Sequence, residues 1–532
     1  MARKHTPASK QVLPKIPLRP SLSGWLSQRE SIFPWIVAGL YMCVMGLLIV
    51  RYHRVGGLGV ETDFYAELVP QAKKLLGGDF SPLNYGAKGP VYSVLLAAVY
   101  LPVRDYFAAG ILLNLLSGAV FLVAFYRLVK RLFSPVAAAL SLGLVVVNHA
   151  FISFTYQASS DLPFMALCMM SMVMLFSGPA RWNVILSALF GSAAFLTRYN
   201  GAFIVAGSLV YLFFTDGSTT DRLKRAGLWL AVFTLAGLPW FIPNWIATGS
   251  PVRNDNYMNV MLEYYGSVSD QASYETWTDS LPKEFTGMGD IILYDPVYFA
   301  KHTAVNAYSH FRADLTTLLP KWFAVFVLAG VAALWFARPD RKKLFYFVFS
   351  AVYFLILTIV FYNVRFSLFL LTAYVPLAVW PLTAQPVAGK LKSAKYLPAI
   401  ILAAALVVTG TSTSRRIVPE MIQSLRVAGP LRDLGLALKK TSPPDDAILI
   451  ARKPHTAAYA GVTAMMFPAD VTSIGELTDF CKAHGVGYVL YSGLEYQYRP
   501  HLRELLNLGG NHPGLAYLFH NDFGVIYRVA AK

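Results

Sequence analysis

The sequence of 532 residues has few charged side chains, few cysteines and none of the common nucleotide-binding motifs. Charged residues make up 14% of the chain, whereas soluble globular domains contain about 25%. The three cysteines show neither metal-ligand spacing nor the pattern of a disulfide framework. The sequence also lacks a P-loop, a Rossmann glycine fingerprint, H-E-x-x-H and G-x-S-x-G, which argues against the chemistries that depend on them.

Long segments of apolar residues make up much of the chain. Hydrophobic residues make up 56% of the chain, and the mean hydropathy is +0.48. Many runs are close to the length of about 20 residues that a helix needs to cross a bilayer. The sequence therefore predicts a polytopic α-helical membrane protein with about eleven spans, at 34–51, 106–127, 134–154, 161–178, 183–197, 201–215, 225–246, 320–337, 344–362, 366–384 and 396–412.

The net charge of +17 comes from short basic segments between these spans. They include Arg127–Arg131, Arg222–Arg225 and Arg338–Lys343. Such a distribution follows the positive-inside rule and gives no reason to expect nucleic acid as a partner. It predicts a cytoplasmic basic tail at 1–33 without a cleavable signal peptide, and an odd number of spans then puts the C-terminus outside.

Three regions are expected outside the membrane. A transmembrane module at 34–412 carries an outer loop at 52–105, with interfacial helices at 63–76 and 89–103, and a long outer loop at 247–319. A soluble α/β domain follows at 413–532, with a helix at about 419–440 and a turn at Pro443–Asp446. Strands are predicted at 447–451, 486–491 and 525–529, and Ser473 and Glu476 predict a capping box before a helix.

Two acids at the outer face are the candidate catalytic residues. Asp63 opens the first interfacial helix, with Glu61 and Thr62 just before it, and Asp161 opens the fourth span. Helix capping is an alternative explanation for each acid, because Asp favours the N-cap. Carboxylates this close to lipid usually have a function, so we expect Asp63 and Asp161 to lie in one site.

Three cations on the same side run against the positive-inside pattern. Lys88 precedes a Gly-Pro step and either snorkels to the surface or contacts a phosphate. Arg198 and Arg365 each lie between apolar spans. Arginine in such a place needs a negative partner, which is either a structural carboxylate or a lipid phosphate.

Motifs in a consistent order carry a family resemblance. They are Asp63 with Tyr65-Ala66-Glu67, Lys88-Gly89-Pro90-Val91-Tyr92, Ser160-Asp161-Leu162-Pro163, Thr197–Gly201, Thr248-Gly249-Ser250-Pro251, and, near the C-terminus, Pro443–Asp445 and His484–Tyr488. Together they resemble the GT-C glycosyltransferases, in particular the bacterial branch related to protein O-mannosyltransferases and the lipid A aminoarabinose transferase. Some members read D-E-x-x-Y, and by strict count Glu61 takes the place of the first acid, so Glu61 and Asp63 compete as the catalytic base. We favour Asp63.

The resemblance implies an inverting transfer of a sugar from a polyprenyl-phosphate donor to a lipid, glycan or protein acceptor at the outer face of the bacterial inner membrane. Asp63 is then the general base, and Asp161 orients the acceptor or a divalent metal, whose participation is left open. Lys88, Arg198 and Arg365 contact the donor phosphate, and Tyr65, Tyr92, Tyr199 and Asn200 contact substrate.

A topological argument also favours a lipid-linked donor. Nucleotide sugars stay inside the cell, whereas the candidate acids face outward, so an activated sugar has to reach them on a lipid. Two other functions remain as alternatives. One is a flippase or transporter of a lipid-linked saccharide, although the sequence shows no internal repeat of the kind common in transporters. The other is an inactive transferase-like subunit of a complex.

Overall fold

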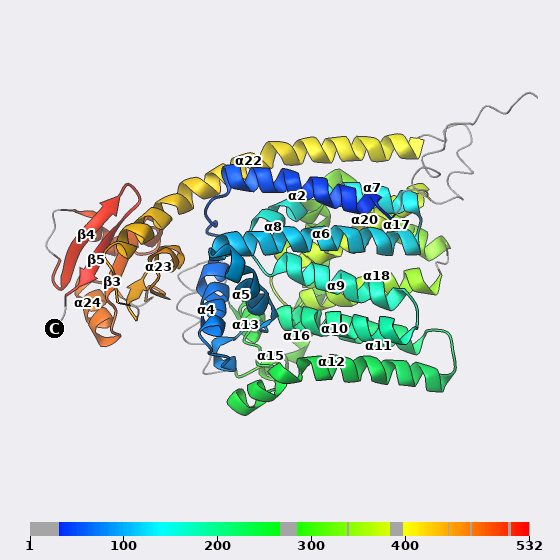
Figure 1. Ribbon diagram of the computed structural model, residues 1–532, viewed down its shortest axis with the longest axis horizontal. Helices are drawn as coiled ribbons and strands as arrows, with labels where there is room; N and C mark the ends of the chain where they lie inside the picture. The colour runs from blue at the N-terminus through cyan, green and yellow to red at the C-terminus, as the bar shows by residue number, and fades with distance from the viewer. Residues whose placement is uncertain are drawn as a thin grey trace, which may run out of the picture.

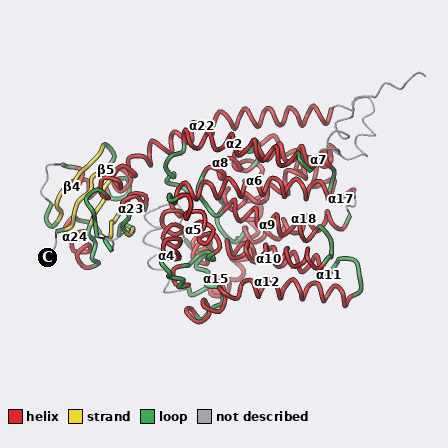
Figure 2. Tube along the Cα trace, viewed as in Figure 1, coloured by secondary structure: helices red, strands yellow, loops and turns green. Residues whose placement is uncertain are grey.

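The computed structural model describes residues 31–266, 285–337, 340–383, 397–444, 446–468, 471–508 and 512–530. Nearly all of the expected basic tail, the middle of the expected outer loop at 247–319, and Asp445 of the expected turn lie outside these ranges. Helices fill most of the described chain, and the strands gather in the C-terminal part (Figure 2).

A bundle of roughly parallel helices forms the larger part of the molecule (Figure 1). Its members are α2 (Phe33–Tyr52), α6 (Tyr106–Leu132), α7 (Pro135–Val146), α8 (His149–Tyr156), α9 (Asp161–Phe176), α10 (Arg181–Thr197), α11 (Ala202–Phe213), α12 (Thr219–Thr248), α17 (Ala324–Ala337), α18 (Arg341–Leu357), α20 (Leu371–Thr383) and α22 (Leu397–Lys439). Within the described ranges, five helices are long and apolar enough to cross a membrane, or up to seven if each bent pair is one span. Each expected span coincides with helix, but the count of eleven stays a prediction.

The expected span 134–154 is not one straight helix. It is divided into α7 and α8, which meet at an angle of 60°. Asn148 explains the break, because its side chain accepts a hydrogen bond from the backbone N–H of Phe151 and so begins a new helix.

Short helices cover one end of the bundle. The expected interfacial helix at 63–76 is present as α3 (Glu61–Asp63), the π-helical turn η1 (Phe64–Leu68) and α4 (Val69–Leu76). A short turn, η2 (Pro82–Asn84), leads to α5 (Val91–Val103), which matches the second expected interfacial helix. These helices lie at the end of the bundle that faces the C-terminal sheet (Figure 1).

The described parts of the region at 247–319 are largely helical, which corrects the expectation of a long loop. They contain α13 (Tyr257–Tyr265), α15 (Met288–Tyr294), α16 (Pro296–Ala313) and the π-turn η5 (Asp314–Leu318). A 3-10 turn, η6 (Lys321–Phe323), then leads into α17. Asp295 accepts a hydrogen bond from the backbone N–H of Tyr298, so α16 begins with a capped first turn.

The long helix α22 joins the bundle to the C-terminal sheet (Figure 1). It has 43 residues, whereas the sequence suggested a span ending at 412 and a separate helix beginning near 419. Pro419 and Pro430 both lie inside α22. No residue between 413 and 418 breaks the helix, so α22 continues through the proposed domain boundary.

The C-terminal sheet has the strand order β2-β1-β3-β5-β4. Its strands are β1 (Ile448–Ile450), β2 (Thr463–Met465), β3 (Tyr488–Ser492), β4 (Leu515–Asn521) and β5 (Gly524–Val529). The α/β character is confirmed, and the three predicted strands fall on β1, β3 and β5. The strands β2 and β4 were missed, because β2 has only three residues and β4 lacks the regular alternation of polar and apolar residues that marks a half-buried strand.

Helices α23 (His455–Ala460), α24 (Ile474–Ala483) and α25 (Gly493–Tyr496) and the 3-10 turn η9 (Pro500–Leu506) accompany the sheet. Ser473 caps α24 as expected, but the Glu476 carboxylate accepts from Thr472 rather than completing the box. The complete capping box lies at Ser492 and Glu495.

Candidate active site

Six charged side chains form a row of alternating sign at the end of the bundle that faces the sheet. In order they are Arg198, Asp161, Arg365, Asp63, Lys88 and Glu67, and we call them the charged cluster. Asp161 accepts from Arg198 Nη1 at 2.5 Å through Oδ1 and from Arg365 Nε at 2.7 Å through Oδ2. Oδ2 of Asp63 lies 2.7 Å from Arg365 Nη1 and 3.6 Å from Lys88 Nζ. Lys88 Nζ also lies 2.9 Å from Glu67 Oε2. Five of the six acids and cations singled out by sequence, all except Glu61, thus belong to one continuous row of ion pairs.

The backbone around Lys88 explains how these segments meet. A side chain at Gly89 would place its Cβ 2.3 Å from the carbonyl oxygen of Leu196, so only glycine allows this approach to the end of α10. On the other side, Asp255 donates its backbone N–H to Gly86 O at 2.9 Å. The Gly-Pro step therefore brings Lys88 close to the segment that carries Arg198.

Arg365 lies in the short helix α19 (Val364–Ser367), between α18 and α20. The 3-10 turn η7 (Leu368–Leu370) follows α19, so the chain between α18 and α20 is not one continuous helix. The side chain of Asn363 accepts from Arg365 N at 2.9 Å. The hydroxyl of Tyr353 on α18 donates to Phe366 O at 2.7 Å. These bonds fix the break, and they allow the guanidinium to reach two acids at once.

Burial changes along the charged cluster. The side chains of Asp161, Arg198 and Arg365 are less than 10% exposed, whereas Asp63 is 37% exposed. Burial acts to raise the pKa of Asp63, but Lys88 and Arg365 outweigh it and lower that pKa to about 2. Asp63 is therefore an ionised carboxylate at the open end of the charged cluster, where Glu67 is also exposed.

Neither acid caps its helix. The N-cap positions of α3 and α9 are Val60 and Ser160, and neither helix start has a side-chain capping bond. Asp161 directs both carboxylate oxygens to arginines. The capping alternative that the sequence allowed is thus absent at both acids.

Glu61, the competing acid, does not join the charged cluster. It is 1% exposed. Its carboxylate accepts from the backbone N–H groups of Gly57 at 2.5 Å and Ala158 at 2.8 Å, and it contacts His53 Nε2 at 3.1 Å. Glu61 therefore ties the first outer segment to the start of α9 and has no free face for a substrate.

The four expected substrate-contacting residues lie in different places. Tyr92 is buried near Asp161 and Arg365. Asn200 lies beside the hydroxyl of Tyr353. Tyr65 instead contacts the Tyr459 hydroxyl at 2.9 Å, and Tyr199, in the 3-10 turn η3 (Tyr199–Gly201), accepts from Trp240 Nε1 at 3.3 Å. Tyr92 thus lies near the charged cluster, and Asn200 contacts a tyrosine that is itself near Arg198 and Asp161.

Two buried polar atoms beside the acids lack a partner. Among the residues that the structure describes, Nη2 of Arg365 and the hydroxyl of Tyr92 make no hydrogen bond. A buried donor without a partner is unfavourable. Both atoms are therefore suited to bind a ligand oxygen.

Sequence reasoning missed contacts from the C-terminal part of the chain. Lys453 Nζ donates to Thr62 Oγ1 at 3.3 Å, and His455 Nε2 donates to Gly57 O at 3.1 Å. Burial lowers the pKa of His455 to about 4, although the bond to Gly57 opposes the shift, so this histidine is neutral at pH 7. Both residues follow β1, and polar residues at the carboxyl end of a predicted parallel strand were an available signal.

Metal ligands are not gathered at this site in the described ranges, where no group of three or more His, Cys, Asp or Glu side chains occurs. Asp63 and Asp161, the two acids considered as ligands, are bridged by Arg365. A divalent ion between these acids would have to replace the guanidinium.

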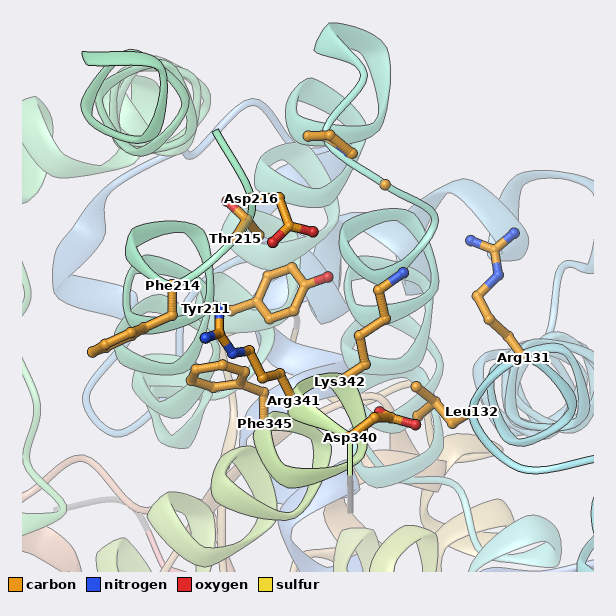
Figure 3. Close-up of a pocket in the computed structure, with 12 residues that line it drawn as sticks. Arg131, Leu132, Tyr211, Phe214, Thr215, Asp216, Asp340, Arg341, Lys342 and Phe345 are labelled. Atoms are coloured by element: carbon orange, nitrogen blue, oxygen red, sulfur yellow. The ribbon is translucent and has the colours of Figure 1, made fainter. Parts of the chain in front are cut away.

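A separate hollow of about 330 Å³ lies at the other end of the bundle. Figure 3 shows Arg131, Arg341 and Lys342 around it together with Asp216 and Asp340. Arg131 belongs to the last turn of α6, whose first residue, Tyr106, lies at the end near the charged cluster. This hollow is lined by residues of the expected cytoplasmic segments and has no part in the candidate site.

Comparison with known proteins finds one family match, over less than a third of the chain. The family described as dolichyl-phosphate-mannose-protein mannosyltransferase matches residues 87–246. No curated protein matches the sequence. The matched stretch contains Lys88, Asp161 and Arg198.

Several solved structures share the whole fold. ArnT from Cupriavidus metallidurans bound to undecaprenyl phosphate superposes with a TM-score of 0.57 at 13% identity, over 96% of this chain and 99% of that chain. An oligosaccharyltransferase from Archaeoglobus fulgidus in complex with zinc and sulfate gives 0.60 at 13% identity, over 92% and 72%. The archaeal oligosaccharyltransferase AglB in complex with an inhibitory peptide and a dolichol-phosphate gives 0.56 at 12% identity, over 94% and 74%. The chain therefore shares the fold of these structures, as the resemblance to the GT-C glycosyltransferases predicted, and its described helices include five to seven candidate membrane spans.

Proposed function

We propose that the protein transfers a sugar from a polyprenyl-phosphate donor to an acceptor hydroxyl at the outer face of the inner membrane, with inversion. The observation that carries this proposal is the position of Asp63, a partly exposed acid that contacts both Lys88 and Arg365. A general base and cations for a phosphate are thus held in one place. The ArnT neighbour, solved with undecaprenyl phosphate, supports the donor class.

In the proposed reaction the acceptor oxygen attacks the anomeric carbon of the donor sugar. Asp63 takes the hydroxyl proton as the new C–O bond forms, and general-base assistance contributes about 10²–10⁴-fold. The bond between the anomeric carbon and the phosphate oxygen breaks, and the polyprenyl phosphate leaves with the electron pair. Negative charge therefore grows on the phosphate in the transition state.

Lys88 and Arg365 are placed to stabilise that charge. Arg365 has Nη2 without a partner, and the Tyr92 hydroxyl is a further donor beside it. Fixed donors aimed at developing charge often supply the largest part of catalysis. Arg198 contacts Asp161 and Ser160, so we assign it the role of holding Asp161 in place rather than of binding phosphate directly.

The same contacts suggest how Asp63 becomes a sufficient base. A carboxylate with a pKa of about 2 accepts protons weakly. A donor phosphate that takes up Lys88 and Arg365 removes part of the positive field at Asp63, and its pKa rises as a result. Donor binding would then activate the base only when a sugar is present to be transferred.

Binding of undecaprenyl phosphate tests the proposal without knowledge of the sugar. We expect the lipid to raise the melting temperature of the purified protein, and Lys88→Ala to reduce this stabilisation. Mass spectrometry of cell-envelope glycans with and without the gene then identifies the sugar. An unchanged envelope together with no stabilisation by the lipid would contradict the function.

A further inference from the structure

A second cavity, of about 590 Å³, lies between the membrane module and the C-terminal part. Its walls come from the loop after α2, from α4, from the junction of α5 and α6, and from α22 and α23. Five cationic side chains line it, namely Arg54, Lys73, Arg104, Arg432 and Lys439. The single acid of the lining, Asp105, already accepts from Ala108 N at 2.7 Å as the cap of α6. The cavity therefore carries a strong excess of positive charge.

The cations of this cavity are not neutralised by neighbouring acids. Within the described ranges, Lys73, Arg104 and Lys439 take part in no ion pair, and Arg432 pairs with its sequence neighbour Asp433. Burial and the charge of Lys439 both lower the pKa of Lys73. Like charges held together in this way favour an anion between them.

Aromatic rings form the rest of the walls. Tyr100 and Tyr106 stack with centroids 3.9 Å apart and planes inclined by 7°. Lys73 Nζ lies 5.8 Å from the centroid of the Tyr106 ring. The hydroxyls of Tyr65 and Tyr459, which also line the cavity, are 2.9 Å apart. Flat rings with a polar edge beside cations suit a ligand that has both hydroxyl groups and negative charge.

The backbone of Arg104 is also unusual. Its φ angle is +61°, in the left-handed region that non-glycine residues seldom adopt. Its N–H caps the end of α5 by bonding to Tyr100 O at 2.8 Å. Backbone strain of this kind gathers at ligand-binding sites. Here it turns the chain at the point where the arginine enters the cavity wall.

We propose that this cavity binds an anionic saccharide, carrying carboxylate or phosphate groups, that forms part of the acceptor. Its role as an acceptor site rests on the proposed function, whereas its binding chemistry does not. Tyr65 on the cavity wall and Asp63 in the charged cluster lie two positions apart on one helical segment, so they face different sides of it. Because a helix with side chains is about 10 Å wide, an acceptor that reaches both sites must be larger than one sugar ring.

Direct binding tests the proposal on the purified full-length protein in neutral detergent. The probe is a fluorescent oligogalacturonate, and its neutral methyl ester is the matched probe without charge. We expect the charged form to bind at least about tenfold more tightly than the ester. Equal affinity for the two probes would overturn the proposal.

Charge reversal identifies the site. The double variant Lys73→Glu and Lys439→Glu is expected to lose about tenfold or more of the affinity for the charged probe. The control, Lys440→Glu with Lys482→Glu, makes the same change in net charge at exposed positions outside the cavity lining. Equal losses in both double variants would overturn the proposal, because they would show a general effect of net charge.

A further binding measurement distinguishes a saccharide ligand from an ordinary lipid headgroup. Binding of phosphatidylglycerol nanodiscs, with no binding of oligogalacturonate, would also overturn the proposal. In a transfer assay the cavity variant should raise KM for the acceptor and keep kcat, whereas Asp63→Asn should lower kcat. Selective oligogalacturonate binding by a protein that transfers no sugar would refute the proposed function and leave the cavity assignment intact.

Discussion

Arg365 and Asp161 lie 204 positions apart in the sequence, yet Nε of the arginine is 2.7 Å from the carboxylate. The same guanidinium holds Asp63 through Nη1. Two acids so close together would repel each other without a cation between them. Arg365 thus permits an ionised Asp63 close to a second, buried acid, and it links three segments that the sequence separates widely.

Asp63→Asn is the direct test of the base. Asparagine keeps the size of the side chain but does not accept a proton, so we expect a folded protein that still binds undecaprenyl phosphate and transfers sugar roughly 10²-fold more slowly or worse. Turnover by the purified variant measures the effect. Full activity would sink the mechanism as proposed.

Glu61→Gln separates the two competing acids. Glu61 is buried and accepts from Gly57, Ala158 and His53, so an amide leaves part of this set unpaired. We expect a loss of about 1–3 kcal/mol in the free energy of unfolding, with turnover per folded molecule retained. Thermal unfolding and activity on the same sample distinguish the roles. Loss of turnover at normal stability would move the base to Glu61.

Lys88 is expected to act on the donor. Lys88→Ala removes a charge-assisted contact to the phosphate and should raise KM for the donor and lower kcat, because the phosphate gains charge as it leaves. Lys301→Ala is the control, since Lys301 is exposed on α16 and outside the charged cluster. Unchanged kinetics in Lys88→Ala would remove this lysine from the donor site.

Asp161→Asn tests the buried end of the charged cluster. Asp161 binds both Arg198 and Arg365, and its neutralisation leaves two buried cations without full compensation. Breaking a buried pair costs about 3–5 kcal/mol, so we expect a much lower melting temperature than that of Asp63→Asn. Comparable stability of the two variants would show that the burial gradient along the charged cluster has little energetic weight.

Much of this site was predictable from sequence. Arginines at the outer face run against the positive-inside pattern, so a negative partner for Arg198 and Arg365 was expected, and both have carboxylate partners in the structure. The partner's identity was not predictable, because it depends on how the ends of α9, α10 and α19 meet. By strict count Glu61 holds the place of the first acid, and only the different directions of Glu61 and Asp63 on the helix separate a buried anchor from a reachable acid.

Other features depend on tertiary contacts that leave no local pattern. Tyr65 sits in a family-like motif, yet its hydroxyl meets Tyr459 from the other end of the chain. The continuity of α22 was hidden by Pro419, which is a helix-start signal in sequence but lies inside a helix here. The helical character of the described part of 247–319 was also missed, because its mixed polar and aromatic sequence resembles a loop.

The orientation of the C-terminal domain is tested by cysteine labelling. Cys481 is buried, so Lys482→Cys at an exposed neighbouring position provides the label site, in a Cys43→Ala background. We expect an impermeant maleimide to react before the inner membrane is lysed. Arg341→Cys, at the other end of the bundle, should react only after lysis. Reversed labelling would overturn the outward topology and the argument for a lipid-linked donor.

The pH dependence of turnover tests the link between donor binding and the base. In the free protein the pKa of Asp63 is about 2, so it stays ionised through the range in which the protein is folded. A bound phosphate that draws on Lys88 and Arg365 raises this pKa towards or above the ordinary aspartate value of about 4.

The two kinetic parameters should therefore respond differently to acid. Protonation of Asp63 abolishes its function as a base, so each parameter falls as the pH drops through the relevant pKa. The ratio kcat/KM reports the free protein and should stay flat from about pH 7 down to pH 4, whereas kcat reports the donor complex and should already decline near pH 4. In Asp63→Glu the pH at which kcat declines should shift, because the new carboxyl has a different pKa. If kcat and kcat/KM declined at the same pH, the donor would not change the electrostatic field at Asp63. A decline of kcat at acid pH that persists unchanged in Asp63→Asn would assign the titration to another group.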